Sequence, residues 1–214
     1  MEEQGFFYRD TWAEVDLDCI LANVASIKNH LPQEVNVIAV VKANAYGHGD
    51  VQVAETALEA GVAYLAVAFM DEAIALRNKG ITAPILVLGA SRPENVRMAV
   101  KFDITITVFQ KEWLHEALKY LQSDDRISLH LKVDTGMGRI GVRNTAELTA
   151  IEQIISENDQ LILEGIYTHF ATADELDETY MYQQLSLFEG MISALKTQFE
   201  WQKKPVVCLP EGKA

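Results

Sequence analysis

The segment VNVIAVVKANAYGHG, residues 35–49, decides the fold class, because it joins a short apolar run directly to a chemically active side chain. Residues 35–41 form a nearly continuous apolar run rich in β-branched side chains, which is typical of a strand buried on both faces of a parallel sheet. Lys42 follows at once, then Tyr46 and two glycines that allow tight backbone turns. Lysine is rarely buried, so at the end of a core strand Lys42 is either an exposed cap or a functional group.

The same alternation of apolar runs and helical segments continues along the chain. Further strands are predicted at residues 63–68, 84–88, 104–108, 127–133 and 161–168. Helices are predicted at residues 18–31, 51–60, 71–79, 97–101, 111–121, 145–157 and 180–198. This alternation predicts parallel βαβ units. The Gly-x-Gly-x-x-Gly turn that marks a dinucleotide-binding sheet is missing from the first predicted βα unit. We therefore predict a TIM-like (β/α) barrel with its chemistry at the carboxyl ends of the strands.

The number of predicted strands is lower than a closed barrel requires. Six strands are clear and residues 204–209 predict a seventh, whereas a (β/α)8 barrel has eight. Residues 11–17 also have a strand pattern, in which Trp12 and Asp16 indicate an edge position. The chain is therefore expected to form an incomplete α/β barrel.

Composition narrows the classes of function. Hydrophobic residues make up 49% of the 214 residues and charged residues 23%, so a sizeable core is expected. The net charge of −13 argues against nucleic-acid binding, although a local pocket can still accept a small anion. Cys19 and Cys208 form neither a disulfide framework nor a metal-binding pattern, and Cys19 is expected to be a small buried thiol. No apolar run is long enough to span a membrane and no signal sequence is evident, so a cytoplasmic protein is predicted.

Basic side chains occur where several predicted strands end. Lys42 ends the first strand, Lys132 lies near the end of the fifth, and His169 ends the sixth. A lysine in a barrel mouth is a candidate Schiff-base nucleophile, with a solvated strand cap as the alternative for Lys42. Lys132 could extend its amine to solvent, Arg139 could be a solvated loop residue, and His169 a hydrogen-bonded structural residue. His48 is interpreted as a loop residue, and the remaining histidines and tryptophans as structural: His30, His115, His130, Trp12, Trp113 and Trp201.

Three segments resemble motifs of the alanine racemase family in the right order. VVKANAYGHG, residues 40–49, is similar to the family's pyridoxal-phosphate attachment motif. LKVDTGMGRIG, residues 131–141, and YTHFATAD, residues 167–174, are similar to two further motifs, and residues 11–17 resemble the family's opening strand. The likeness runs from about Tyr8 to about Trp201, so it covers most of the chain.

The resemblance implies a role for each matching residue. Lys42 would bind pyridoxal 5'-phosphate (PLP) as a Schiff base and act as one of two acid/base groups at the substrate α-carbon. Tyr46 would contact the cofactor phosphate, and Arg139 would face the cofactor's phenolic oxygen and bind the substrate carboxylate. Lys132 is similar to a lysine that family members often carry as a carbamate paired with the arginine. His169 would orient an arginine that faces the pyridine nitrogen, and no metal site is predicted.

The resemblance also implies an activity and a domain layout. The family interconverts L-alanine and D-alanine, which supplies D-alanine for peptidoglycan, and its full-length members are homodimers. Residues 1–17 would be a strand that pairs with the C-terminal domain, and residues 18–214 a partial PLP-binding barrel. The ending PVVCLPEGKA departs from the family pattern, since the phosphate-binding Asn-Ser pair, the last strand and the C-terminal β-domain have no counterpart. This departure predicts a chain that is inactive alone; the alternatives are a non-catalytic PLP-binding homeostasis protein and a non-functional fragment.

Overall fold

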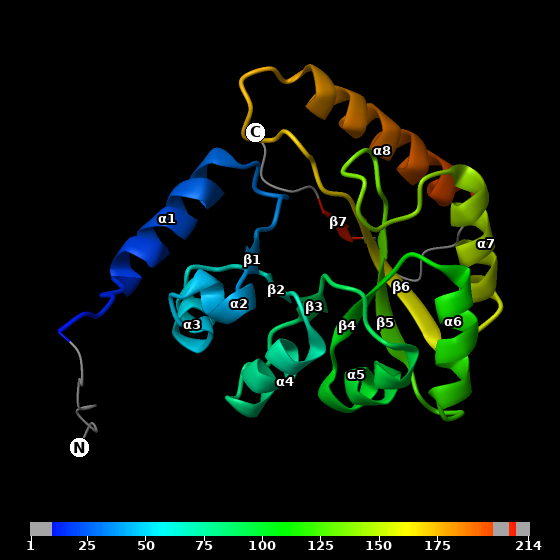
Figure 1. Ribbon diagram of the computed structural model, residues 1–214, viewed down its shortest axis with the longest axis horizontal. Coiled ribbons are helices and arrows are strands. Elements are labelled where there is room, and N and C mark those ends of the chain that lie inside the picture. The colour runs from blue at the N-terminus through cyan, green and yellow to red at the C-terminus, as the bar shows by residue number, and fades with distance from the viewer. Residues whose placement is uncertain (1–9, 199–205, 209–214) are drawn as a thin grey trace.

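The chain forms one parallel sheet in the computed structural model, which describes residues 10–198 and 206–208. Its seven strands are β1 Ile38–Val40, β2 Tyr64–Val67, β3 Ile85–Val87, β4 Thr105–Val108, β5 Ile127–Lys132, β6 Leu161–Tyr167 and β7 Val206–Cys208. The strands lie in the order in which they occur in the chain, with β1 and β7 at the two edges. The sheet is curled (Figure 1). The predicted TIM-like barrel is thus confirmed, as an incomplete barrel within the described residues.

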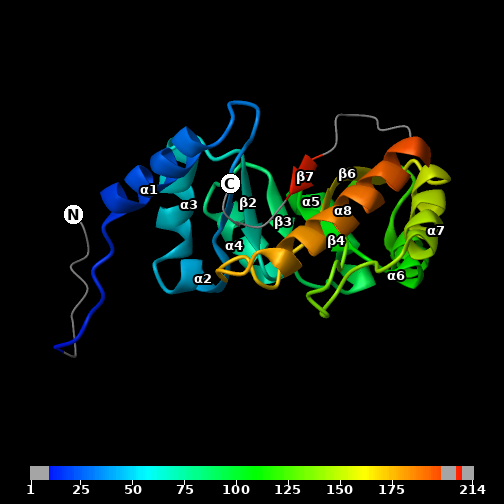
Figure 2. The ribbon, with the colours of Figure 1, turned by 90° about the horizontal axis from the view of Figure 1, so that it is seen from above.

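Helices follow the strands as βαβ units require. They are α1 Leu17–His30, α2 Lys42–Tyr46, α3 Asp50–Glu59, α4 Met70–Asn78, α5 Val96–Phe102, α6 Lys111–Ala117, α7 Thr145–Ser156 and α8 Thr179–Gln198, with 3-10 turns at Pro93–Asn95 and Leu118–Tyr120. They succeed one another around the sheet, from α1 and α3 at the β1 end to α7 and α8 at the other (Figures 1 and 2). Among the described residues, no helix is both long and apolar enough to cross a membrane.

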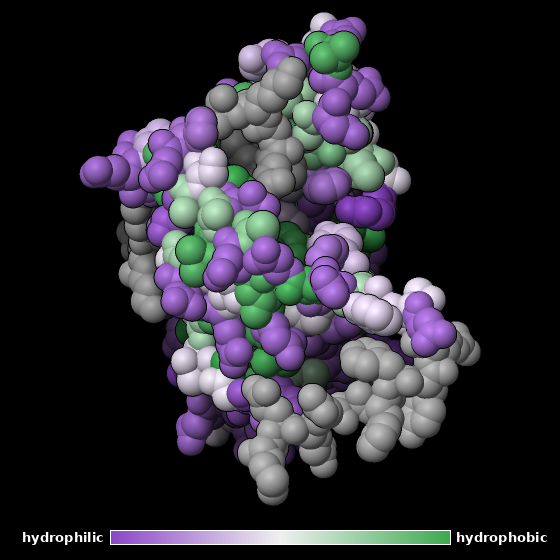
Figure 3. Space-filling model, turned by 90° about the vertical axis from the view of Figure 1, so that its left-hand side faces the viewer, coloured by the Kyte–Doolittle hydropathy of each residue, from purple (hydrophilic) through white to green (hydrophobic). Residues whose placement is uncertain are grey.

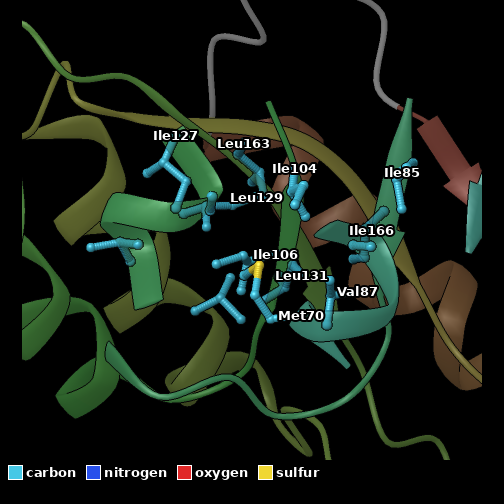
Figure 4. Packing of buried hydrophobic residues seen from close by; sticks show 14 of the residues in the cluster. Met70, Ile85, Val87, Ile104, Ile106, Ile127, Leu129, Leu131, Leu163 and Ile166 are labelled. Atoms are coloured by element: carbon cyan, nitrogen blue, oxygen red, sulfur yellow. The ribbon is translucent and has the colours of Figure 1, made fainter. Parts of the chain in front are cut away.

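The main core lies between the sheet and the helices. Side chains from three neighbouring strands, Ile85, Val87, Ile106, Leu129 and Leu131, gather in one cluster (Figure 4). Helices contribute further fully buried side chains: Leu76, Leu114, Leu148, Ile151 and Phe188. A separate, smaller cluster of Ala66, Leu86 and Tyr167 lies on the opposite face of the strands. Strands β3 and β4 are buried on both faces, which explains their continuous apolar runs. The expectation of full burial is wrong for β1, which lies at the sheet edge and leaves Val40 39% exposed.

The start of the chain differs from the expectation. No strand forms at residues 11–16; the chain enters α1, where the Asp16 carboxylate accepts a hydrogen bond from Cys19 N at 3.1 Å. Asp16 is therefore a helix N-cap rather than the marker of an edge strand. The interpretation of Cys19 as buried is wrong, since it is exposed, and Trp12 is 60% exposed rather than packed. A domain boundary at residue 17 stays a prediction.

Helix α1 lies at the β1 end of the molecule with no fully buried residue. Leu17 and Ile27 are exposed on it, and apolar residues gather among polar ones on this face (Figure 3). Lys28 Nζ on α1 donates two hydrogen bonds at the C-terminus of α3, to Ala60 O at 3.3 Å and to Gly61 O at 2.8 Å. This places an ammonium group at the helix C-terminus, where the unpaired carbonyls favour positive charge.

Candidate active site

Lys42 lies directly beyond the first strand, as predicted. Val41 N still donates to Ala66 O at 2.8 Å, so sheet pairing continues to the residue before the lysine. The chain then turns through four successive non-glycine residues with positive φ: Ala43 at 52°, Asn44 at 55°, Ala45 at 49° and Tyr46 at 56°. This conformation costs roughly 1–2 kcal/mol for each such residue, so the surrounding structure must hold it in place.

The left-handed turn brings Lys42 and Tyr46 together. Lys42 Nζ lies 5.7 Å from the centroid of the Tyr46 ring, and Tyr46 is 62% exposed. Hydrogen bonds close the turn, from Ala45 N to Val41 O at 3.0 Å and from Gly47 N to Asn44 O at 3.0 Å. The phenol is thus presented at the carboxyl end of the sheet, beside the lysine.

Lys132 ends β5 and is buried, with only 4% of its surface exposed. Its amine therefore does not extend to solvent, which excludes the alternative of a long side chain reaching the surface. Burial is the main cause that lowers its pKa to about 7, with a further decrease from the charge of Arg139 and a partial opposing effect of Asp134. A substantial fraction of this amine is consequently neutral near neutral pH.

Arg139 projects from a compact loop built around Asp134. The Asp134 carboxylate, 2% exposed, accepts hydrogen bonds from Gly138 N at 2.9 Å, Gly136 N at 3.2 Å and Arg143 Nε at 3.3 Å. Burial opposes ionisation, but these donors outweigh it and hold the pKa of Asp134 below its ordinary value. The anion therefore organises the glycine-rich loop, and Arg139 itself is exposed on it.

His169 lies two residues beyond β6, which ends at Tyr167 rather than at the histidine. Burial lowers the pKa of His169, and the charges of Lys132, Arg139 and Lys42 lower it further. Three basic groups from separate segments therefore act on one imidazole. The structure brings these four predicted residues to one end of the sheet.

A hydrogen-bonded network underlies this cluster on the inner face of the strands. Thr107 Oγ1 and the Tyr167 hydroxyl are 2.7 Å apart, and the hydroxyl also donates to Leu88 O at 3.2 Å. Tyr64 and Thr105 form a second hydroxyl pair at 2.7 Å. The Tyr167 hydroxyl thus links β6 to β4 and to the residue after β3, which helps to fix the carboxyl ends of these strands.

Two residues that the sequence analysis missed support the site. The Glu72 carboxylate on α4 accepts from Ala43 N at 2.7 Å, and Gln184 on α8 is fully buried. Gln184 Oε1 accepts from Ala171 N at 2.9 Å, and its Nε2 donates to His169 O at 3.3 Å. An acid in the first turn of a helix is a recognisable capping signal, but no sequence pattern shows which distant loop it also holds.

The structure also places other histidines and tryptophans that the sequence analysis named. His48 Nδ1 hydrogen-bonds its own loop at Ala45 O, as a loop residue would, and His130 is completely buried. Trp113 packs on the core and donates to Ser91 O, whereas Trp201 lies outside the described residues. Within the described ranges, His, Cys, Asp and Glu side chains form no group able to hold a metal ion.

Basic groups gather at this end of a chain whose net charge is −13. A local positive field in an acidic protein suits a small ligand that carries phosphate or carboxylate groups. A shallow, open hollow of about 400 Å³ lies between the Asp134 loop and α8, lined by Gly136, Arg143, Tyr180 and Leu187 among others. The lysine of the turn is not among its lining residues.

The curled parallel sheet, with basic side chains at the carboxyl ends of its strands, defines the chain as an incomplete TIM-like barrel. The family model described as "Alanine racemase, N-terminal domain" matches residues 15–208. The chain therefore belongs to the alanine racemase family and contains its N-terminal domain.

Individual relatives agree with this assignment. Alanine racemase of Geobacillus kaustophilus is 54% identical over 192 residues, which cover 90% of this chain and 50% of that protein. A solved alanine racemase of Bacillus anthracis with bound L-Ala-P has a TM-score of 0.90 at 49% identity, covering 96% of this chain and 53% of that one. A histidine racemase of Leuconostoc mesenteroides has a TM-score of 0.79 at 31% identity, over 90% of this chain and 50% of that one. The chain spans about half the length of the curated relatives it matches.

Proposed function

We propose that this chain is the cofactor-binding part of an alanine racemase that uses PLP to interconvert L-alanine and D-alanine. The observation that carries the proposal is the gathering of Lys42, Lys132, Arg139 and His169 at one end of the sheet. Family membership supports the reaction class. Racemisation in the cytoplasm would supply D-alanine for peptidoglycan.

The chemistry of these side chains fits PLP, which carries a phosphate and a phenolate. Lys42 supplies the amine for covalent attachment, and Tyr46 presents a hydroxyl that can donate to the phosphate. Arg139 supplies a guanidinium for the phenolic oxygen and for the carboxylate of the amino acid. His169 has a lowered pKa, so it is largely neutral and free to hold a neighbouring side chain by a hydrogen bond. When bound, PLP acts as an electron sink that makes the α-proton of an amino acid acidic.

Proton transfer on two opposite faces is needed to invert the α-carbon. We assign one face to Lys42, whose amine can accept the α-proton and return it. We assign the other face to a group outside this chain, in the C-terminal domain of a partner subunit. The active protein is thus expected to be a homodimer of longer chains.

Lys132 is proposed to carry a carbamate. Its lowered pKa leaves a neutral amine near neutral pH, and such an amine can attack carbon dioxide. A nitrogen–carbon bond forms, one amine proton leaves, and a carboxylate-like anion results. The product would replace a buried cation near Arg139 by an anion that can hold the guanidinium in place.

Alanine is the proposed substrate because the relatives at 54% and 49% identity are named alanine racemases. The histidine racemase among the structural neighbours is 31% identical, so the same fold also serves an enzyme named for a larger amino acid. Identity therefore favours alanine over histidine for this chain.

Covalent trapping tests the proposal directly. The chain is mixed with PLP, reduced with borohydride and digested, and mass spectrometry locates any adduct. We expect the adduct on Lys42 and its loss in Lys42→Ala, whereas Lys111→Ala, which removes an exposed lysine of α6, should behave like the parent. An adduct that persists unchanged in Lys42→Ala would overturn the assignment. A Lys42 adduct without racemisation, even in the presence of the C-terminal domain, would support a non-catalytic PLP-binding protein instead.

A further inference from the structure

The left-handed turn after Lys42 needs a partner outside itself. Four successive L-residues with positive φ are unfavourable, and such a turn persists only where neighbouring groups over-determine it. The Ala43 N–H lies two residues beyond Val41, whose N–H still pairs with Ala66 O in the sheet. Its acceptor is Oε1 of Glu72, at 2.7 Å.

Glu72 joins two loops at the carboxyl end of the sheet. Its second oxygen, Oε2, accepts from Ala68 N at 2.7 Å and Phe69 N at 3.0 Å, in the connection from β2 to α4. One carboxylate thus binds three backbone N–H groups from two neighbouring strand ends. Its own residue lies in the first turn of α4, where negative charge is favourable.

This arrangement controls the direction of the lysine side chain. The Ala43 N–H belongs to the planar peptide group that begins at the Lys42 carbonyl carbon. Holding that N–H fixes the peptide plane, and therefore the angle at which the Lys42 side chain leaves the strand end. A carboxylate suits the task because it only accepts hydrogen bonds, whereas a glutamine would turn an NH2 group toward one of the donors.

We propose that Glu72 is a positioning residue that holds the left-handed turn and thereby sets the Lys42 amine for covalent capture of PLP. The proposal rests on the proposed function of Lys42. Glu72 acts through the backbone of Ala43, and it adds to the site a residue outside the three sequence motifs.

Glu72→Gln is the test variant and Asp71→Asn its matched control. Asp71 is exposed and adjacent in the same first turn, so both changes remove one negative charge at the same place. In the cofactor-free chain we expect amide hydrogen exchange at Ala43 to become about tenfold faster or more in Glu72→Gln, and to stay at the parent rate in Asp71→Asn. The PLP concentration that gives half-maximal borohydride-trapped adduct on Lys42 should rise about tenfold in Glu72→Gln alone.

A second change separates positioning from general stability. Glycine adopts positive φ without steric cost, so Ala43→Gly in the Glu72→Gln background should recover part of the lost capture. A role confined to capping α4 would not be rescued by this change. If Glu72→Gln does not fold, Glu72→Asp replaces it, since it keeps the charge but is too short to reach both loops.

Each outcome is decisive. Parent-like exchange at Ala43 together with parent-like capture in Glu72→Gln would overturn the proposal, as would a loss of capture that merely follows the unfolded fraction. Failure of the parent chain to form any adduct on Lys42 would contradict the proposed function instead. In that case the exchange rate at Ala43 still decides whether Glu72 holds the turn.

Discussion

The Nζ atom of Lys132 lies 4.3 Å from the centroid of the Tyr167 ring, and both side chains are buried. Two opposing effects act on this amine. A cation over an aromatic face is stabilised by about 0.5–2 kcal/mol, which favours the ammonium form. Burial favours the neutral amine and, with a smaller contribution from the charge of Arg139, lowers the pKa of Lys132 to about 7.

This pair predicts a pH dependence of stability. Without the proposed carbamate, the folded chain releases the Lys132 proton at a pKa of about 7, against an ordinary value of 10.5. Between these values the unfolded chain therefore binds more protons. The contribution of Lys132 to stability should therefore rise from about pH 7 to about pH 10 and be lost as the pH falls through 7. Lys132→Met should remove this slope and stabilise the chain below neutral pH.

Urea unfolding on either side of neutrality measures the effect of Lys132→Met. Lys111→Met is the control, because it removes an exposed lysine of α6 and should leave the pH slope of the parent unchanged. A parent-like slope in Lys132→Met would contradict the assignment of the titration to Lys132.

The Asp134 loop gives a second prediction. Asp134→Asn keeps one acceptor oxygen but removes the charge that binds Arg143 and two glycine N–H groups, so we expect a loss of about 1–3 kcal/mol in the free energy of unfolding. Because the folded pKa of Asp134 is lowered, its stabilisation should be present above an ordinary pKa of 3.8 and lost as the pH falls through the lowered value. Asp124→Asn, at an exposed position, should have little effect at any pH. Equal denaturant midpoints for the two variants near neutral pH would argue against the loop-organising role.

Gln184 gives a third prediction, about His169. Gln184→Met has a similar volume but leaves Ala171 N without its acceptor and His169 O without its donor, so about 1–3 kcal/mol of stability should be lost. NMR titration should also show a changed His169 pKa, because the histidine loop is no longer fixed to α8. Gln183→Met on the exposed side of the same helix is the control. An unchanged His169 titration would mean that the loop holds its position without Gln184.

The close approach of Gly165 to His130 predicts that substitutions at these two positions have non-additive effects on stability. A Cβ atom at Gly165 would lie 2.7 Å from His130 Cε1 and 2.7 Å from Val206 O, so Gly165→Ala should cost about 1–3 kcal/mol. His130→Ala removes one of these two contacts, and the double variant should therefore lose less stability than the sum of the single variants, by at least about 0.5 kcal/mol. A double-mutant cycle of urea unfolding measures this coupling. Strict additivity would place the conflict entirely at the β7 backbone.

The sequence predicted the parts of the fold that follow from local pattern. Continuous apolar runs gave the parallel strands, and the residues after them gave the position of Lys42, because carboxyl strand ends meet at one edge of a sheet. The strand predicted at residues 11–17 is wrong. A strand-like pattern describes side chains that suit a pleated surface, whereas a strand also requires a neighbouring strand to accept its hydrogen bonds. Asp16 shows the ambiguity, since the same residue type favours both sheet edges and helix caps.

The supporting residues could not be predicted because their partners lie far away in sequence. Glu72 is 29 residues from Ala43, and Gln184 is 49 residues from Thr135, to which it also donates. The left-handed turn was equally hidden, since alanine and tyrosine rarely adopt positive φ and only the packed structure imposes it. Local pattern thus located the candidate site residues, whereas tertiary contacts fix their orientation.

The order of the strands in the sheet has a consequence for folding during synthesis on the ribosome. Every strand from β2 onward pairs with the strand immediately before it in the chain. Each new strand therefore meets a partner that has already been synthesised, and no pairing within the described sheet waits for a distant segment. The growing chain can add one βα unit at a time to a nascent core, with β1 as the template on which successive strands assemble.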